Sequence, residues 1–266
     1  MNWKTIAAEI ERTATARGRA TSGHFSVEGF RLVERALASG YEFHSVLVGE
    51  SSVRKTDLRA RRLIDELEQR EIPIAYAPDL GLSQIIEGRE TGAIAALLTI
   101  PKAKPLAKIV PPRGSARLLV AVHVDDPGNV GALARTALAG GADGLVLVGP
   151  GDPYHPRAVR ISRGSLFKLP IVRLDTPELL LEQLAELEVE SIAAVTQGGI
   201  PLQSLRPQPR TRWAICVGSE AFGLSDALVA KMDRKCSIPM TGEIDSYSVH
   251  AAAAILLYAL RPPAED

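Results

Sequence analysis

The chain has 266 residues, of which 46% are hydrophobic and 23% charged, and its 31 acidic and 31 basic residues leave no net charge. Such values are typical of a soluble globular protein with room for one large or two ordinary domains. No apolar run approaches the ~20 residues of a membrane span, and no apolar core follows Met1, so we expect neither a transmembrane helix nor a signal peptide. The only cysteines, Cys216 and Cys236, are predicted to be buried, which favours a reducing, cytoplasmic location over a disulfide scaffold.

Strand and helix patterns alternate over the first 100 residues. Ile6 and Ile10 lie four residues apart and would share one face of a helix. A βαβα order of this length predicts a small three-layer α/β domain over residues 1–100. Helices are predicted for residues 3–18, 29–37 and 57–69, and strands for residues 24–27, 45–48, 73–77 and 94–98.

Residues 101–114 hold four prolines, which remove backbone donors and block regular structure. We therefore expect a linker between two domains. Its only charges are basic, from Lys102, Lys104, Lys108 and Arg113. A second basic stretch, residues 151–173, sets five cations against Asp152 alone; they are Arg157, Arg160, Arg163, Lys168 and Arg173. Both stretches suit contacts with RNA phosphates, and ordinary solvated surface charge is the alternative.

After the linker, the alternation of strands and helices resumes over residues 115–266. The predicted strands are continuous apolar runs, as parallel sheets covered on both faces require. They span residues 118–124, 144–148, 191–195 and 213–217, and the predicted helices span 128–139, 176–187, 224–232 and 246–260. The second domain is therefore expected to be α/β with a parallel sheet.

The first of these helices belongs to a motif that runs from Asp126 to Ala137. Arg135 is the only charge between residues 128 and 142, and it shares a helix face with Gly131. An arginine beside a small-residue notch suits a phosphate or a polarised oxygen. The alternatives are an arginine that reaches from a buried helix to a carboxylate, and an Asn129 that merely caps the helix.

A second motif runs from Val217 to Leu224 directly after a buried strand. Its Gly218 would let the backbone approach a ligand. Glu220 could hold Asn129 or Arg135, or it could cap a helix beginning near Leu224. A serine-hydrolase elbow is excluded, because the pattern would need glycine at positions 217 and 221.

A third motif, Ile238 to Val249, leaves a strand and turns at Gly242 into the last helix. That helix is apolar all round apart from His250, and we expect it to be buried on every side.

Two other interpretations of the sequence fail. Gly149 and Gly151 lack the third glycine of a dinucleotide-binding turn, and the residues around His123 lack a second ligand cluster for a metal.

The three motifs together resemble the TrmH/SpoU branch of the SPOUT RNA methyltransferases. The stretch from Gly23 to Leu37 resembles the opening of the substrate-binding domain of SpoU-type enzymes, which itself resembles kink-turn-binding ribosomal proteins. The resemblance implies a C-terminal SPOUT domain with a trefoil knot, and homodimers whose sites combine both chains. It also implies transfer of a methyl group from S-adenosylmethionine to a ribose 2′-hydroxyl.

The matching positions imply the roles of individual residues. Catalytic roles fall to Asn129, Arg135, Glu220 and Ser246, and cofactor binding falls to Gly218, Ile238, Met240 and Tyr247. Because a guanidinium is not deprotonated in proteins, Arg135 is expected to orient the hydroxyl and stabilise its developing negative charge. The chain departs from the family pattern at Ser248, where an asparagine amide usually helps to order the site.

The expected partner is structured RNA, with rRNA favoured over tRNA because the N-terminal domain adds a second grip. No metal and no membrane are expected. The alternative is a non-catalytic RNA-binding or ribosome-assembly protein that retains the fold. Ser248 and His250 motivate that alternative.

Overall fold

The computed structural model describes residues 2–54, 58–83, 85, 94–205 and 212–261. The chain forms two compact units. The first comprises residues 1–102 together with 154–167, and the second comprises residues 103–153 together with 168–266. The segment from Tyr154 to Phe167 therefore belongs to the first unit, although it lies within the stretch that the sequence assigns to the second domain.

The first unit contains eleven α-helices and strands in its described residues. They are α1 (Trp3–Thr13), α2 (Ala16–Ser22), β1 (His24–Glu28), α3 (Phe30–Ala38), β2 (Phe43–Gly49), α4 (Glu50–Arg54), α5 (Leu58–Gln69), β3 (Ile74–Ala77), α6 (Asp79–Ser83), β4 (Ile94–Thr99) and α8 (Pro156–Ser162). The sheet order is β1-β4-β2-β3. Strand β4 is antiparallel to β1 and β2, whereas β2 and β3 are parallel.

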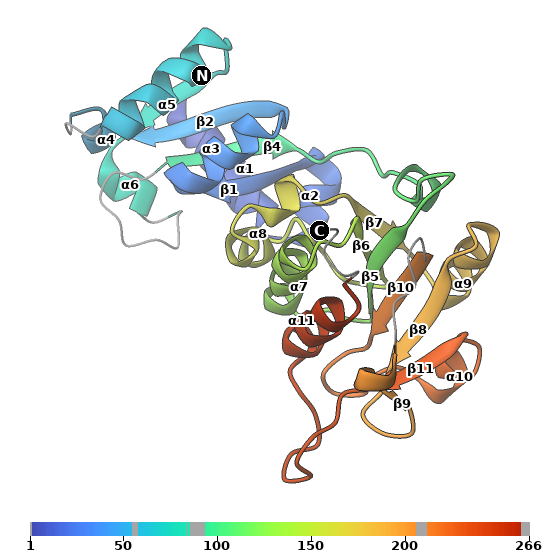
Figure 1. Ribbon diagram of the computed structural model, residues 1–266. Helices are drawn as coiled ribbons and strands as arrows, with labels where there is room; N and C mark the ends of the chain where they lie inside the picture. Colours follow the sequence, from blue (N-terminus) through green and yellow to red (C-terminus); the bar gives the residue numbers. More distant parts are fainter. Residues whose placement is uncertain (1, 55–57, 84, 86–93, 206–211, 262–266) are drawn as a thin grey trace. The chain divides into compact units, whose positions relative to one another are not determined.

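Helices cover both faces of this sheet, as the three-layer expectation requires. Figure 1 shows α1 and α3 on opposite faces. On the α1 face, Ile6 and Ile10 pack with Leu47 and Leu97 in one buried cluster. Successive strand residues point to opposite faces of a sheet. Val46, next to Leu47, and the other alternate strand residues therefore point to the second face.

The single helix predicted for residues 3–18 is in fact two helices. Helix α1 ends at Thr13, and the hydroxyl of Thr15 accepts a hydrogen bond from the Gly18 backbone N–H at 3.0 Å to begin α2. Gly18 lies so close to the turn before it that an added Cβ would be 1.9 Å from the Arg12 carbonyl oxygen. A threonine cap therefore overrides the continuous apolar period.

The second unit is built on seven parallel strands. Its elements are β5 (Ala116–Val122), α7 (Pro127–Ala139), β6 (Gly144–Val148), β7 (Ile171–Leu174), α9 (Pro177–Glu186), β8 (Glu190–Ala194), β9 (Ile200–Pro201), β10 (Arg212–Val217), α10 (Asp226–Val229), β11 (Arg234–Ser237) and α11 (Val249–Ala259). The sheet order is β7-β6-β5-β10-β8-β11-β9. Each of its pairings is parallel, so the predicted parallel sheet is confirmed.

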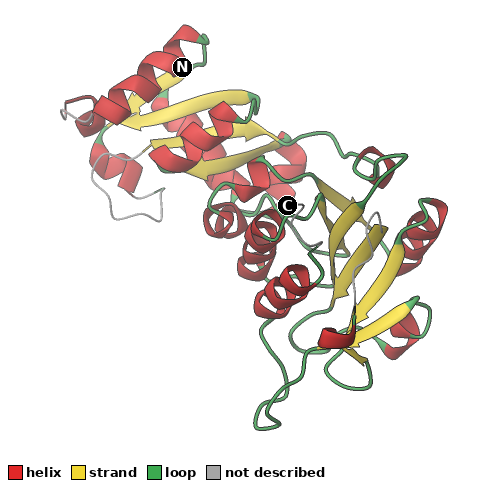
Figure 2. Cartoon of the chain, viewed as in Figure 1, coloured by secondary structure: helices red, strands yellow, loops and turns green. Residues whose placement is uncertain are grey.

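Helices also cover both faces of the second sheet (Figure 2). Helices α9 and α10 place Leu184 and Leu228 against Val120 and Val146 in the main buried cluster. Helices α7 and α11 pack against each other and against the central strands on the opposite face. Helix α10 has four residues, far fewer than the predicted range 224–232.

Helix α11 has one feature that matters for the site. Within one chain, the sheet and α7 cover only part of its surface, and the burial expected on every side also requires a subunit interface. His250, Ala254 and Tyr258 form an exposed stripe at four-residue spacing, and Tyr258 is 70% exposed. None of the helices in the described residues is long and apolar enough to cross a membrane.

Candidate functional site

A cavity of about 360 Å³ opens in the second unit where β8, β10 and β11 end. Its walls come from three segments: the residues after β8, the turn after β10, and the loop between β11 and α11. The carboxyl ends of parallel strands meet at one edge of a sheet, and ligands bind in the crevice outside that edge. The topology therefore gathers loops that are distant in sequence around one space.

Most of the predicted site residues line this cavity. They are Gly218, Glu220, Ile238, Met240, Ser246 and Tyr247. Asn129 and Arg135 lie on α7 and are not among the lining residues. The structure therefore brings the second and third motifs together within one chain and leaves the first motif outside their cavity.

The turn from Gly218 to Gly223 is held closed by its own backbone. The Gly223 N–H donates to the Ser219 carbonyl oxygen at 2.8 Å, and the Phe222 N–H donates to Ser219 Oγ at 3.3 Å. A Cβ added at Gly218 would lie 2.0 Å from the Gly223 carbonyl carbon. Glycine at position 218 thus lets the turn fold back on the strand end, a reason different from the ligand approach that the sequence suggested.

Glu220 connects the second motif to the third. Its Oε1 accepts a hydrogen bond at 3.4 Å from the backbone N–H of Val249, the first residue of α11. A carboxylate at a helix N-terminus also interacts favourably with the helix dipole. The predicted capping of a helix near Leu224 is wrong, because Ser225 caps α10 instead.

Ser248 occupies the N-cap position of α11 and makes no side-chain capping bond there. Glu220 supplies a side-chain acceptor at this helix end. The carboxylate thus accepts from the residue that directly follows Ser248.

Arg135 is exposed on α7 and makes no hydrogen bond or ion pair with any described residue. The alternative of an arginine that reaches a carboxylate in its own chain therefore does not hold for the described residues. The helix cap is Asp126, whose Oδ1 accepts from the Asn129 N–H at 2.9 Å, so the capping alternative for Asn129 is also wrong. Both side chains remain available to another molecule.

Both cysteines are buried, as predicted, and Cys236 lines the cavity. Burial raises the pKa of Cys216 to about 12 and that of Cys236 to about 11. Because a thiol with so high a pKa is not ionised near neutrality, neither group is an activated nucleophile. The described residues contain no cluster of three or more His, Cys, Asp or Glu side chains able to hold a metal ion.

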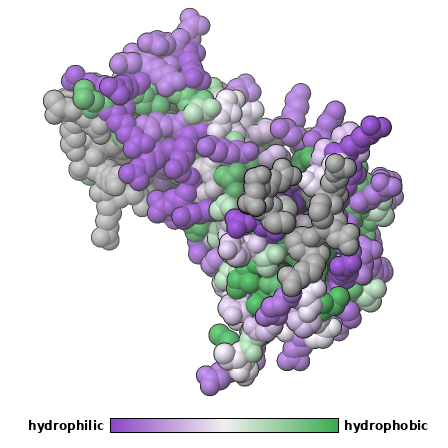
Figure 3. Space-filling model, in the orientation of Figure 1, coloured by the Kyte–Doolittle hydropathy of each residue, from purple (hydrophilic) through white to green (hydrophobic). Residues whose placement is uncertain are grey.

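The basic stretches predicted from the sequence are exposed but divided. Arg157, Arg160 and Arg163 lie in the first unit, on or just after α8, whereas Lys168 and Arg173 lie in the second. The visible face of the first unit is mainly hydrophilic (Figure 3). Arg157, Arg160 and Arg163 therefore form one exposed arginine group in the first unit.

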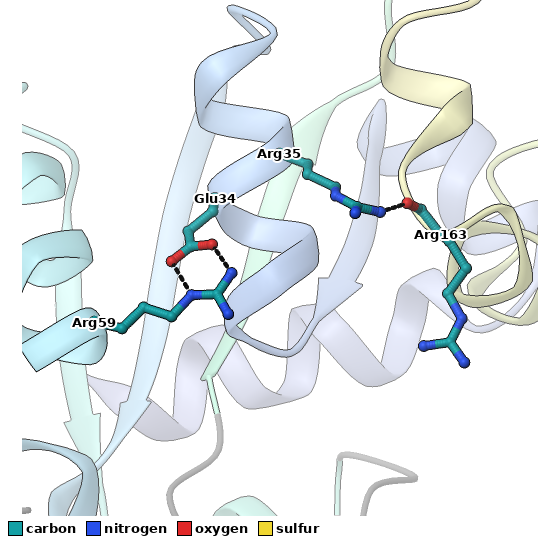
Figure 4. Close-up of polar contacts among 4 residues, drawn as sticks. All are labelled: Glu34, Arg35, Arg59 and Arg163. Carbon is teal, nitrogen blue, oxygen red and sulfur yellow. Dashed lines mark hydrogen bonds and ion pairs between the residues drawn. The ribbon is translucent and has the colours of Figure 1, made fainter. Parts of the chain in front are cut away.

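The segment that carries these arginines is attached to the first unit by specific contacts. The Arg35 guanidinium donates to the Arg163 carbonyl oxygen, and the Arg163 side chain points away from that contact (Figure 4). The Tyr41 hydroxyl donates to the Leu166 carbonyl oxygen at 3.2 Å, and its ring packs edge-on against Phe167. Beside Arg35, Glu34 forms a two-bond ion pair with a guanidinium from α5.

Comparisons with known proteins agree with this architecture. The model of the SpoU rRNA Methylase family matches residues 116–258, and that of the MRM3-like substrate binding domain matches residues 8–76. The 23S rRNA (guanosine(2553)-2'-O)-methyltransferase RlmP of Bacillus subtilis is 33% identical over 261 residues, which cover 98% of this chain and 94% of the relative. The 23S rRNA (uridine(2479)-2'-O)-methyltransferase of Streptomyces viridochromogenes is 30% identical over 247 residues, covering 90% and 83%.

Solved structures support the same relationship. The crystal structure of the SpoU methyltransferase AviRb from Streptomyces viridochromogenes with AdoMet superimposes with a TM-score of 0.84 at 25% identity, over 96% of each chain. The crystal structure of an RNA 2'-O ribose methyltransferase gives a TM-score of 0.80 at 28% identity, over 96% of this chain and 94% of that one. Family match, relatives and fold agree along the chain, which belongs to the SpoU rRNA methylase family.

Proposed function

We propose that the cavity at the ends of β8, β10 and β11 binds S-adenosylmethionine, and that a structured rRNA presents a ribose 2′-hydroxyl to it. As a family member, the chain is an S-adenosylmethionine-dependent RNA ribose 2′-O-methyltransferase. The non-catalytic alternative is therefore not retained. One observation carries the proposed site: loops from three strand ends converge on a single cavity that holds most of the predicted residues.

The chemistry of the cavity suits this cofactor. Among the residues that the structure describes, its lining includes the carboxylates of Glu220 and Asp245 and no lysine, arginine or histidine, which favours a ligand with a positive centre such as a sulfonium. Val195 and Leu256 add apolar wall, and the volume lies within the usual range for ligand pockets. The bound cofactor supplies an electrophilic methyl group.

We assign Gly218, Ile238, Met240 and Tyr247 to cofactor binding. All four line the cavity. The backbone of their loops would hold the adenine and methionine parts, and the Tyr247 ring, 43% exposed, stands beside open space. Ser246 lies in the same loop, where its hydroxyl can donate to or accept from a ribose.

Arg135 is proposed to orient the acceptor hydroxyl and to stabilise the negative charge that develops on its oxygen. Asn129 lies before Arg135 on the same helix, α7, and its amide is proposed to contact the same RNA nucleotide. Because a guanidinium stays protonated, the hydroxyl proton must leave to another group, and an RNA phosphate oxygen is the proposed acceptor.

We further propose a homodimer in which Asn129 and Arg135 of one chain complete the cavity of the other. Two observations support this arrangement. Both residues lie outside the cavity of their own chain, and α11 exposes an apolar stripe that includes Ala254 and Tyr258. A self-complementary helix face of this kind is what a twofold interface requires. The trefoil knot implied by the family, formed by the segments around β10, β11 and α11, belongs to the same proposal.

The RNA is proposed to be rRNA, held by the first unit as well as by the second. The match of residues 8–76 to a substrate binding domain and the exposed arginines of α8 support a second grip. The two relatives described above are named for 23S rRNA. A cytoplasmic location follows for an enzyme that acts on rRNA, and the proposed chemistry requires no metal.

Subunit mixing tests the composite site. Arg135→Ala keeps the cavity but removes the guanidinium that orients the acceptor hydroxyl, whereas Gly218→Val disrupts the cavity but keeps Arg135. If each site uses both chains, equal co-expression yields mixed dimers with one intact site, and activity returns to about a quarter of the wild-type value. If each site uses one chain, every mixed dimer stays inactive, which would refute the composite arrangement. Each variant alone, checked for folding by thermal denaturation, is the control.

A further inference from the structure

Phe222 is the most exposed of the large hydrophobic side chains in the described residues, with 90% of its surface accessible. It lines the cavity, at the tip of the turn between Gly218 and Gly223. A single exposed apolar side chain is ordinary on a protein surface, but an aromatic ring at a cavity offers a flat π face on which another molecule can stack. Nothing in the sequence separates this residue from an ordinary core phenylalanine, and only the structure reveals its position.

The backbone that carries this ring is held in a closed turn. The backbone N–H of Phe222 donates to Ser219 Oγ at 3.3 Å, and the next N–H, from Gly223, donates to the Ser219 carbonyl at 2.8 Å. Gly218 packs directly beneath, with room for no side chain. The backbone beneath the ring therefore loses little conformational freedom when a partner covers the turn.

The surroundings of the ring decide what kind of partner fits. Glu220 is two residues away, Asp245 lines the same cavity, and none of the described residues in the lining is a cation. A phosphate would be repelled there, whereas the uncharged face of a nucleobase would not. Aromatic side chains stack on bases of any sequence, because every base has a π face.

We infer that Phe222 stacks on the base of the nucleotide whose ribose is methylated, and thereby holds that nucleotide at the cavity mouth. This inference rests on the proposed function. Sequence-specific recognition of structured RNA mostly targets unpaired loops and bulges, whose bases leave their own stack and stack on aromatic side chains. Phe222 replaces the lost neighbour and so positions the 2′-hydroxyl, which makes it a substrate-positioning residue.

The test separates aromatic from merely apolar contact. Phe222→Trp and Phe222→Tyr are expected to keep kcat/KM for RNA within about threefold of wild type, whereas Phe222→Leu and Phe222→Ala lower it by roughly 5- to 150-fold. The Kd for S-adenosylhomocysteine and the sedimentation coefficient should not change. Ile244→Ala, which alters a 64% exposed side chain outside the cavity lining, is the matched control and should leave all three values unchanged.

Three results would overturn the inference. Full activity of Phe222→Leu would reduce the ring to an apolar contact. A changed sedimentation coefficient would make Phe222 a contact with a second copy of the chain, and lost cofactor affinity would make it part of the cofactor wall.

A separate readout keeps the inference distinct from the proposed function. The indole introduced by Phe222→Trp should be quenched by substrate rRNA more than the native tryptophans of the wild type are, because a stacked base quenches it. If the wild type transfers no methyl group, the proposed function fails while this quenching still reports stacking. Absence of added quenching in an RNA-bound complex would refute stacking even if methyl transfer is observed.

Discussion

Replacing Gly218 with alanine perturbs the cavity at its most crowded point. The added Cβ would lie 2.0 Å from the Gly223 carbonyl carbon, 2.2 Å from its oxygen and 2.4 Å from the Leu224 nitrogen. All three are backbone atoms, so no side chain can rotate out of the way. The turn must open, which breaks the 2.8 Å hydrogen bond between Gly223 and Ser219.

The magnitude follows from these contacts. Inserting one methyl group into a closed site costs about 1–3 kcal/mol, and losing a backbone hydrogen bond about 0.5–1.5 kcal/mol. The two costs are alternatives, since opening the turn relieves the clash. If the cofactor binds only the closed turn, binding must restore the clash, so its affinity falls by the clash cost less the cost of opening, at most about 150-fold.

Calorimetric titration with S-adenosylhomocysteine measures this loss. The matched control is Gly198→Asn outside the cavity lining, because position 198 has a φ of +72°, which asparagine tolerates, and no atom lies within 4 Å of an added Cβ. We expect near-wild-type affinity for the control and a weakened Kd for Gly218→Ala. Equal affinities for Gly218→Ala and the wild type would refute the closed turn as a part of the binding site.

Two further predictions concern the supporting structure. Gly164 has a φ of +84°, and an added Cβ would lie 2.6 Å from Arg35 Cδ. Gly164→Ala should therefore lower the free energy of unfolding by about 2 kcal/mol, and by about 1 kcal/mol less when Arg35 is also replaced by alanine. Additive effects of the two substitutions on urea unfolding would contradict the contact. Asp233 accepts hydrogen bonds from the Ser191 hydroxyl at 2.6 Å and backbone at 2.8 Å, which hold its pKa below the ordinary 3.8. This stabilisation is complete above about pH 3.8 and is lost as the pH falls through the lower pKa of the folded state, so Ser191→Ala should cost about 1 kcal/mol at pH 7 and less at pH 3. The same unfolding free-energy difference at both pH values would count against that bond.

Much of the fold was predictable because each domain is built from continuous apolar strands separated by helices with clear periods. The strands of the second sheet are apolar throughout, as burial on both faces demands. The exceptions have local causes. Thr15 divides the first predicted helix, and α8 begins at Pro156 after a His155 cap, a short signal that the basic charges around it obscured.

Long-range contacts could not be predicted in this way. The attachment of the segment 154–167 to the first unit depends on Tyr154 packing against Phe25 and on Phe167 packing against Tyr41. Such pairs have no sequence period, because they join residues more than 100 positions apart. The sequence therefore indicated the helices and strands around this segment, but not that the segment packs with the first unit.

In the candidate site, too, the local features were predictable and the long-range contacts were not. Glycine-bearing turns after apolar strands predicted which loops would line a cavity, and parallel topology explains why these loops meet. The partner of Glu220 is the backbone of Val249, 29 residues away, which no local pattern identifies. The position of Arg135 outside its own chain's cavity likewise depends on how α7 packs, and the exposure of Phe222 depends on the closure of a turn that no local pattern predicts.

The most direct measurement is methyl transfer to 23S rRNA from a strain that lacks the gene, followed by nuclease digestion and mass spectrometry of the nucleosides. The wild type should form a single 2′-O-methylated nucleoside, whose 3′ phosphodiester resists alkaline cleavage. Arg135→Ala should form it at least about 100-fold more slowly, because charge stabilisation at the acceptor oxygen is lost. A methyl group on a base, no methylated nucleoside at all, or an Arg135→Ala enzyme as fast as the wild type would contradict the account.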